Sequence, residues 1–475
     1  MLRQRIVLGI CLVLLVASVL TGDKSPTRLI ARAQQAGAPS GRQYTPPFYV
    51  FSPEFPRDIV THDVGAIGFQ PFVDILGWDT FIALNWPVPD PPTQRGVPDR
   101  QNVIGGFVTQ GEGGTKTMPT GPTVWETYKD TDDIFLNPPA QPSSFDTPER
   151  IPPACITPAR ANPAAARRTL AMTAKVSDVL SNFKEAFTMF PLIDQNGEKV
   201  YYEVKVNRAY YDYVVRNQFY NSTMQKGKVI SFPSSSDQTR DEPAIKVKAA
   251  WKQMGGPGSR QPDDPKKFYT TQALIYDPDT NTCVQRLVGL VGLHIVMKTR
   301  LLPQWNWSTF EQVDNAPDVQ TGPVPGKKYN FFSSQCAGCP FNKPPSSQRP
   351  DFPVQVVRML PVGVEAPNTT YQTALKTLRP DNVWQNYMLV DSQWSGSRDH
   401  IGVPSQPKYL ANTTLETYLQ GAIEDPNAPH GCINCHGKFA AEKDLDFQLY
   451  KAYPHSSSLV QDILKAHGAT APPKR

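Results

Sequence analysis

The pattern of apolar and polar positions predicts helices near the two ends of the chain and strands between them. Residues 69–87 carry apolar side chains at helical spacing, which predicts a helix that ends before Pro87. Residues 164–189 contain no glycine or proline and predict a second helix. Residues 412–421 predict a helix capped by Asn412 or Thr413.

The middle of the chain has the alternation and the β-branched and aromatic content of strands. Residues 277–281, Asp-Pro-Asp-Thr-Asn, read as the turn of a hairpin. A short helix is expected at 210–220, and two more at 440–453 and 456–466. The predicted strands are 199–206, 244–251, 267–276, 283–298 and a segment around Trp305, Trp307 and Phe310.

The composition adds one constraint to this picture. The chain has 48 prolines among 475 residues, about twice the usual share. Proline is excluded from helix interiors and central strands, so long irregular connections are expected. The predicted class is α+β: a mainly antiparallel β-containing body with long Pro-rich loops, followed by a small helical C-terminal segment.

The N-terminus has the features of an export signal. Arg3 and Arg5 precede an apolar run of 15 residues, 6–20, and Ala31-Arg32-Ala33 fits a cleavage site. The run is shorter than the roughly 20 residues that a spanning helix needs. Cleavage would fall well after the run, so an uncleaved membrane anchor is the alternative.

The charge of the mature chain excludes one class of function. The net charge is +5, and residues 1–33 contribute +4 of it, from five basic side chains and one acidic one. The remainder is near +1, which argues against a general nucleic-acid binder or a binder of anionic membranes.

The sequence Cys432-Ile433-Asn434-Cys435-His436 is C-x-x-C-H, the motif at which c-type haem is attached. Two thiols at this spacing can add to the vinyl groups of one haem, and the histidine can be the proximal iron ligand. Export supports this interpretation, because c-type haem is attached outside the bacterial inner membrane. The expected organisation is a signal or anchor at 1–33, a body of unknown function at 34–405 and a haem-binding segment at 406–475.

The sixth iron ligand stays open at this point. A small cytochrome c would offer a methionine downstream of the motif, and no methionine follows His436 here. The position could also be empty or hold water, and an open iron could bind small ligands. The candidates in the chain are His294, Met297, Met388, His400, His430, His455 and His467.

The cysteines outside the haem motif number four once Cys11 is removed with the signal: Cys155, Cys283, Cys336 and Cys339. In an oxidising compartment they suggest two disulfides in one of three pairings, of which Cys155–Cys283 with Cys336–Cys339 closes the shortest loops. Pro340 stands where a second haem motif would need histidine. The nearby prolines argue against a thioredoxin-like pair, and a zinc half-site would lack its second half.

Two other segments contain residue types that occur in functional sites. His294 and Lys298 share one face of a predicted strand, and Glu311 and Asp314 follow, so an acid–base pocket near Trp305 and Trp307 is one interpretation. A histidine hydrogen-bonded in a sheet beside an aromatic core is the favoured one. Residues 111–117 contain glycines and a lysine but do not match a phosphate-binding loop.

Several segments resemble those of uncharacterised exported bacterial proteins of the cytochrome c family. This resemblance covers most of the mature chain and implies covalent haem and an exported location, but no substrate. The segments that carry it are FIALNWP (81–87), GLHIVMKT (292–299), WNWSTFEQVDNAP (305–317), LANTTLETYLQ (410–420) and CINCH (432–436).

The favoured function is therefore one-electron transfer by an exported monohaem c-type cytochrome. Its expected partners are a redox partner protein and the haem-maturation machinery, and its expected location is the periplasm, with attachment to the inner membrane if the anchor is kept. The alternatives are a haem-dependent oxidoreductase whose body binds a substrate, and a haem protein that binds small ligands. An electron carrier needs only about a quarter of this length, which is the argument for the enzyme.

Overall fold

The computed structural model describes one compact unit of the chain, which falls within Gly41–Arg475. The expected export segment, residues 1–33, lies outside the described residues, and the division into body and haem segment stays a prediction. The described residues are 51–58, 69–89, 94–102, 104, 122–171, 190–235, 242–336, 338–345, 352–395, 405–420 and 431–452.

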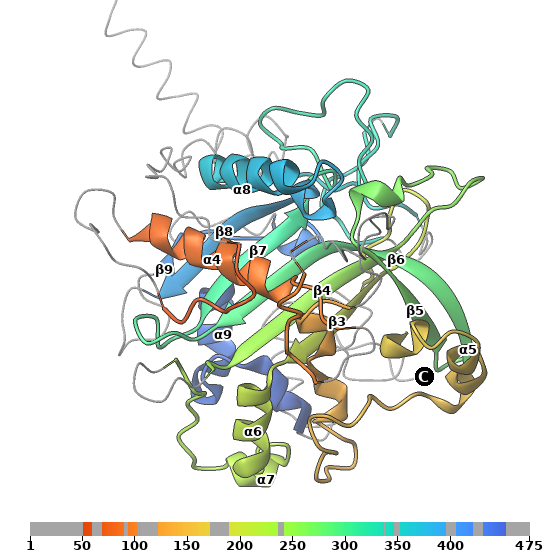
Figure 1. Cartoon of the computed structure of the whole chain (residues 1–475). Helices are drawn as coiled ribbons and strands as arrows, with labels where there is room; N and C mark the ends of the chain where they lie inside the picture. The colour runs from red at the N-terminus through yellow and green to blue at the C-terminus, as the bar shows by residue number, and fades with distance from the viewer. Residues whose placement is uncertain are drawn as a thin grey trace, which may run out of the picture. The chain divides into compact units, whose positions relative to one another are not determined.

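A curled sheet of nine strands forms the centre of the described part (Figure 1). Its main path runs β1-β3-β4-β6-β7-β8-β9, and β5 pairs with both β6 and β2. Every pair is antiparallel except β2 with β5. The strands are β1 (Lys129–Asp130), β2 (Thr169–Ala171), β3 (Val200–Val206), β4 (Ile245–Gln253), β5 (Thr270–Asp277), β6 (Thr282–Met297), β7 (Asn306–Gln312), β8 (Tyr387–Ser395) and β9 (Ser405–Gln406).

The strand β6, of 16 residues, connects the two halves of this sheet. Its first half pairs with β5 in the predicted hairpin, and its second half lies between β4 and β7. Exposed residues recur from Thr282 to Leu287, whereas every residue from Val288 to Met297 is buried. The second half of β6 is therefore covered on both faces.

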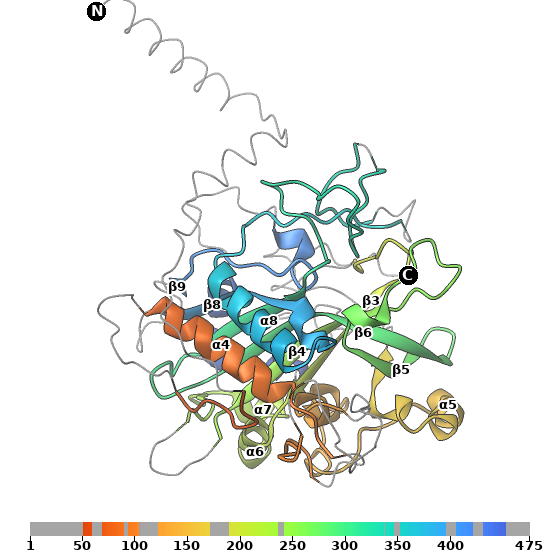
Figure 2. The same ribbon diagram turned by 45° about the horizontal axis from the view of Figure 1, so that its top comes forward.

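Two helices cover one face of the sheet, α4 (Gln70–Leu84) and α8 (Glu365–Leu378). Figures 1 and 2 show them side by side across the strands. The Trp78 ring of α4 stacks on Tyr371 of α8 at 4.9 Å and meets the edge of Phe310 of β7 at 5.1 Å. Gly77 allows this approach, because a Cβ there would lie 2.6 Å from the Ser308 hydroxyl.

The C-terminal segment, defined here as the described residues after β9, 407–420 and 431–452, packs on the opposite face. Side chains alternate between the faces of a strand, so Trp307 points away from the side where Phe310 meets α4. Trp307 contacts His436 of α9 (Cys432–Ala440), and α9 lies behind the sheet in Figure 1. The other described α-helices are α5 (Ile156–Ala161), α6 (Arg208–Arg216) and α7 (Ser222–Gln225).

The predicted strands, the hairpin turn, the helix ending before Pro87 and the short helix near 210 are all confirmed. The predicted helix at 164–189 is wrong over the residues described, which form a 3-10 turn at Ala165–Arg167 and strand β2. Arg168 explains the change. Its side chain is buried between Glu126 and Glu203, and its carbonyl accepts a hydrogen bond from Leu274 of β5, so the chain is held against the sheet.

The helices predicted at 412–421 and 440–453 form only as 3-10 turns. Between 412 and 420 only the 3-10 turn Thr417–Leu419 forms, although the Asn412 side chain does accept hydrogen bonds from Thr414 as a cap would. Residues 441–452 form two 3-10 turns, Ala441–Lys443 and Phe447–Ala452, because two left-handed residues interrupt them. Residues 456–466 lie outside the described ranges.

Candidate haem-attachment site

The helix α9 carries all three residues of the C-x-x-C-H motif. Cys432, Cys435 and His436 stand at positions i, i+3 and i+4, which lie on one face of a helix. Gly431 precedes the helix because space requires it: a Cβ there would lie 2.1 Å from Nε2 of Gln393. The Gln393 side chain also accepts a hydrogen bond from Ile433 N at 2.9 Å and fixes the first turn to β8.

The ring of His436 is fixed by a backbone carbonyl. Its Nδ1 lies 2.6 Å from the oxygen of Leu445, and a carbonyl can only accept, so Nδ1 carries the proton. Nε2 is then the unprotonated nitrogen, the form in which imidazole binds metals. Trp307 and Phe447 pack on the same ring, with centroids at 5.2 and 4.5 Å.

Two buried ion pairs hold the turn that supplies this carbonyl. Lys298 Nζ lies 2.6 Å from Asp444, and Lys246 Nζ lies 2.9 Å from Asp446. Leu445 stands between the two aspartates with φ of 62°. A non-glycine residue holds that conformation only where its surroundings enforce it. We call these two pairs the lysine–aspartate clamp.

Burial determines the protonation of the motif residues. It lowers the pKa of His436 to about 3, with the charge of Lys246 acting in the same direction. It also raises the pKa of Cys435 to about 12 and that of Cys432 above its usual range. In this conformation the imidazole is neutral and both thiols are protonated.

The candidates for the sixth ligand are placed unequally. His294 pairs with Thr309, which stands two residues from Trp307 on β7. His294 and Trp307 therefore lie on the same face of the sheet as near neighbours. Met297 belongs to the opposite face and is not placed for this role. Met388 pairs with Glu311, four residues from Trp307 on β7, or about 13 Å along the strand. His400, His430, His455 and His467 lie outside the described residues.

The acid–base pocket around His294, the less favoured interpretation, does not assemble. His294 Nε2 lies 2.8 Å from Glu416, a residue of the C-terminal segment, and its Nδ1 is buried without a partner in the described part of the chain. Glu311 is bound by Arg358 at 2.7 and 3.1 Å and by Thr413 N at 2.6 Å.

The other residues of that alternative also have other partners. Asp314 pairs with Lys267 and Lys327 near the surface, and Lys298 belongs to the clamp. The favoured interpretation, a histidine hydrogen-bonded within a sheet, agrees with the observed contacts. His294 and Glu416 tie the sheet to the segment that precedes α9.

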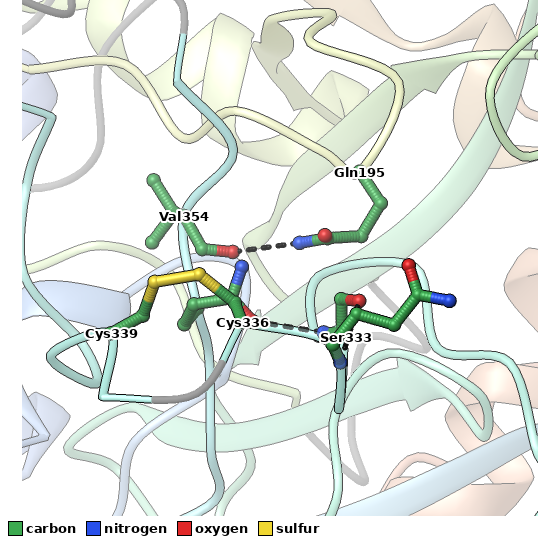
Figure 3. The surroundings of a disulfide bond; sticks show 7 residues. Gln195, Ser333, Cys336, Cys339 and Val354 are labelled. Carbon is green, nitrogen blue, oxygen red and sulfur yellow. Dashed lines mark hydrogen bonds between the residues drawn. A yellow bond between two sulfur atoms is a disulfide. The ribbon is translucent and has the colours of Figure 1, made fainter.

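The four remaining cysteines form the pairs Cys155–Cys283 and Cys336–Cys339. The second pair lies in a loop after β7, shown in Figure 3, where Cys336 N donates to Ser333 O at 3.2 Å. Cys432 and Cys435 are unpaired. This arrangement agrees with the pairing that closes the shortest loops.

Sequence reasoning missed the clamp and the carbonyl of Leu445. Asp444 and Asp446 precede and follow an apolar residue close behind the motif, but their lysine partners lie 146 and 200 residues away in sequence.

In the described ranges no group of three or more His, Cys, Asp or Glu side chains could hold a metal ion. A haem iron takes only one or two ligands from the chain, so this search does not bear on haem.

The helices of the described part include none that is both long and apolar enough to cross a membrane. Residues 111–117, which were weighed as a phosphate loop, lie outside the described ranges. No family model, curated protein or solved structure matches this chain.

Proposed function

We propose that this chain is an exported monohaem c-type cytochrome that transfers single electrons. Cys432 and Cys435 would hold one haem covalently, and His436 would ligate its iron. When bound, haem supplies an iron that alternates between the ferrous and ferric states. The redox partner would be another protein, and the covalent bonds would be made by a haem-maturation system.

The observation that carries the proposal is the hydrogen bond between His436 Nδ1 and Leu445 O. Histidines that bind metals usually donate their second ring nitrogen to a carbonyl or carboxylate, which fixes the tautomer and the ring orientation. Here the carbonyl is itself held by the clamp, and the two thiols lie on the same face of α9. If the C-x-x-C-H sequence had arisen by chance, there would be no reason for the ring of His436 to be fixed in a metal-binding tautomer.

The first experiment tests the covalent haem with a matched control. The full chain is expressed with a haem-maturation system, and haem is stained after denaturing electrophoresis. Cys432→Ala/Cys435→Ala should lose all stain, whereas Cys336→Ala/Cys339→Ala should keep it at the level of the unaltered chain. Stain that survives the first pair of substitutions, or no stain in the unaltered chain, would refute haem attachment at this motif.

A second experiment separates electron transfer from ligand binding. A low-spin ferrous spectrum that carbon monoxide does not change would support an electron carrier, because both axial positions would be filled by the protein. Rapid carbon monoxide binding would instead support the small-ligand alternative. His294→Ala should be recorded beside the unaltered chain, since His294 is nearer to Trp307 than Met388, the other described candidate on that face.

A further inference from the structure

A cleft of about 1510 Å³ lies among the loops around the start of β5. Leu287 of β6 lines it, while Val296 of β6 pairs with Trp307 beside His436. These two residues are nine positions apart, or about 30 Å along the strand. The cleft is therefore distinct from the haem-attachment site.

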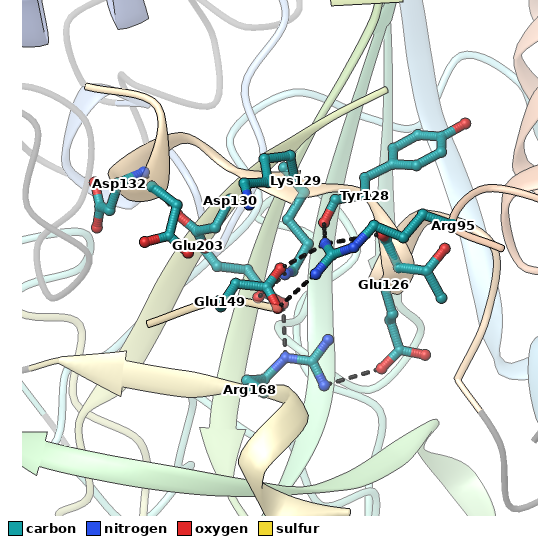
Figure 4. A network of polar contacts seen from close by, with 12 residues as sticks. Arg95, Glu126, Tyr128, Lys129, Asp130, Asp132, Glu149, Arg168 and Glu203 are labelled. Atoms are coloured by element: carbon teal, nitrogen blue, oxygen red, sulfur yellow. Dashed lines mark hydrogen bonds and ion pairs between the residues drawn. The ribbon is translucent and has the colours of Figure 1, made fainter. Parts of the chain in front are cut away.

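One wall of the cleft is a network of mutually satisfied charges (Figure 4). Arg168 bonds Glu203 at 2.8 Å and Glu126 at 2.9 Å, and its guanidinium lies 4.2 Å from the ring centroid of Trp251. Arg95 pairs with Glu149 at 3.0 Å. These groups already bind one another, so the wall supports the cleft. The groups available to bind a ligand lie elsewhere in the cleft.

The start of β5 has an open edge that faces this cleft. The strand β2 covers only Leu274, Ile275 and Tyr276. Before Thr169 the chain turns into Ala165–Arg167 and does not continue along β5. No other described strand pairs with β5 on this side.

The hydrogen-bonding groups on this edge can be assigned from their neighbours. Leu274 N donates to Arg168 O at 2.9 Å, so the backbone of Leu274 points toward β2. The N–H and C=O groups of residues two and four positions earlier point the same way. Thr270 and Gln272 therefore present their N–H and C=O groups to the cleft, where both residues are partly exposed lining residues.

The charges that remain around the cleft are positive. Its acidic lining residues are engaged in ion pairs: Glu126 with Arg168, Glu149 with Arg95, Asp146 with Arg208 and Asp381 with Arg379. The rim lysines Lys266 and Lys376 are exposed and form no ion pair in the described part of the chain. Lys266 nevertheless lies close enough to Asp381 to help Arg379 lower the pKa of that carboxyl group. An occupant of this cleft should therefore be acidic.

We propose that this cleft binds an extended, acidic peptide segment of a partner protein, which adds as a strand to the edge of β5 at Thr270–Gln272. Main-chain hydrogen bonds would supply affinity, and Lys266 and Lys376 would select for negative charge. The cavity exceeds the several hundred Å³ that a small-molecule site usually needs, which suits a peptide better than a metabolite. This docking function does not depend on the haem proposal.

The probe is a synthetic library of ten-residue peptides with glutamate at alternate positions and Val, Thr, Ile or Tyr between them. A second library with lysine in place of glutamate is the control, and binding to the full chain is measured by fluorescence anisotropy. Binding of the glutamate peptides alone is expected. Failure of every glutamate peptide to bind, or equal binding of the lysine peptides, would overturn the proposal.

Gln272→Pro tests the strand edge, with Gln272→Ala as its control. Proline removes the outward N–H but leaves the ladder between β5 and β6, since it is tolerated at a strand edge. We expect Gln272→Pro to weaken binding about tenfold or more and Gln272→Ala to bind like the unaltered chain, because one hydrogen bond and the fit of the backbone are lost. Equal binding by the two variants would refute strand addition.

Two further measurements keep the test decisive if the proline variant unfolds. Lys266→Glu/Lys376→Glu changes only exposed side chains and should weaken the glutamate peptides at least tenfold. Hydrogen exchange should show the amides of Thr270 and Gln272 open in the free chain and protected with peptide. If these amides are already protected without peptide, another part of this chain covers the edge and the proposal is wrong.

Discussion

The chain contains two C-x-x-C segments, and the structure treats them differently. Cys336 and Cys339 form a disulfide in a loop, whereas Cys432 and Cys435 are unpaired on the first turns of a helix. Pro340 follows the first pair and His436 follows the second. Equal spacing therefore occurs with a disulfide in a loop and with two unpaired thiols on a helix.

The surroundings of the two segments differ as much as their chemistry. The helical pair is fixed to the sheet by Gln393, by Trp307 and by the lysine–aspartate clamp. The backbone amides of the loop pair make short-range hydrogen bonds, from Cys336 to Ser333 and from Cys339 to Cys336, while the neighbouring Ser333 and Asn342 bond to Gln355. The two segments therefore differ in the reach of their supports: Lys246 is 200 residues from Asp446, whereas Ser333 is 22 residues from Gln355.

The largest expected loss of stability concerns a third cysteine pair, Cys155 and Cys283, which is compared with the loop pair. Cys155 and Cys283 are 128 residues apart, so replacing both with alanine should cost about 5 kcal/mol of unfolding free energy by the loop-entropy model. Cys336→Ala/Cys339→Ala, at a separation of 3, should cost about 2 kcal/mol. Urea unfolding measures both. Equal losses would show that the loop pair supports more than its own loop.

The clamp provides the next test. Lys298→Met or Lys246→Met leaves a buried aspartate without its partner, which should cost about 3–5 kcal/mol. The exposed pair of Arg100 and Glu54 is the control, and Arg100→Ala should cost less than about 1 kcal/mol. Denaturant unfolding measures the free energy of unfolding of each variant. Equal losses in the clamp variants and in Arg100→Ala would contradict long-range anchoring by the clamp.

The smallest effects concern the glycines near each pair. Gly431→Ala should cost about 2 kcal/mol, because the new methyl group would meet Gln393, whose amide is already bonded to Ile433 N and Pro407 O. Gly338→Ala meets no atom within 4 Å, but its φ of 76° should cost about 1 kcal/mol. Thermal unfolding measures the stability of both variants. An unchanged melting temperature for Gly431→Ala would contradict the close contact between Gly431 and Gln393.

The sheet was predictable from local pattern. Residues 200–206 alternate and are rich in β-formers, and the turn at 277–281 separates two apolar runs, so strand identity follows from the sequence alone. The helix α8 and the strand β8 were not predicted. Both adjoin irregular Pro-containing segments, although the alternation in Tyr387–Ser395 was a usable signal.

The motif residues were predictable because C-x-x-C-H is local, and their supports were not. The failed helix at 164–189 has no breaker residue, and only the distant partners of Arg168 explain why it does not form. Of the clamp lysines, Lys246 reads as an ordinary strand residue, and Lys298 was assigned to a possible acid–base pocket with other partners. Nothing in one sequence pairs them with aspartates near the C-terminus.

The distances of the clamp along the chain have a consequence for the order of assembly. Lys246 and Lys298 are synthesised long before Asp446 and Asp444, which follow them by 200 and 146 residues. The sheet can therefore form while the C-terminal segment is still missing, and this segment packs last. If haem is attached as proposed, an enzyme that must reach Cys432 and Cys435 would have its best access after this segment has emerged and before α9 packs against β8.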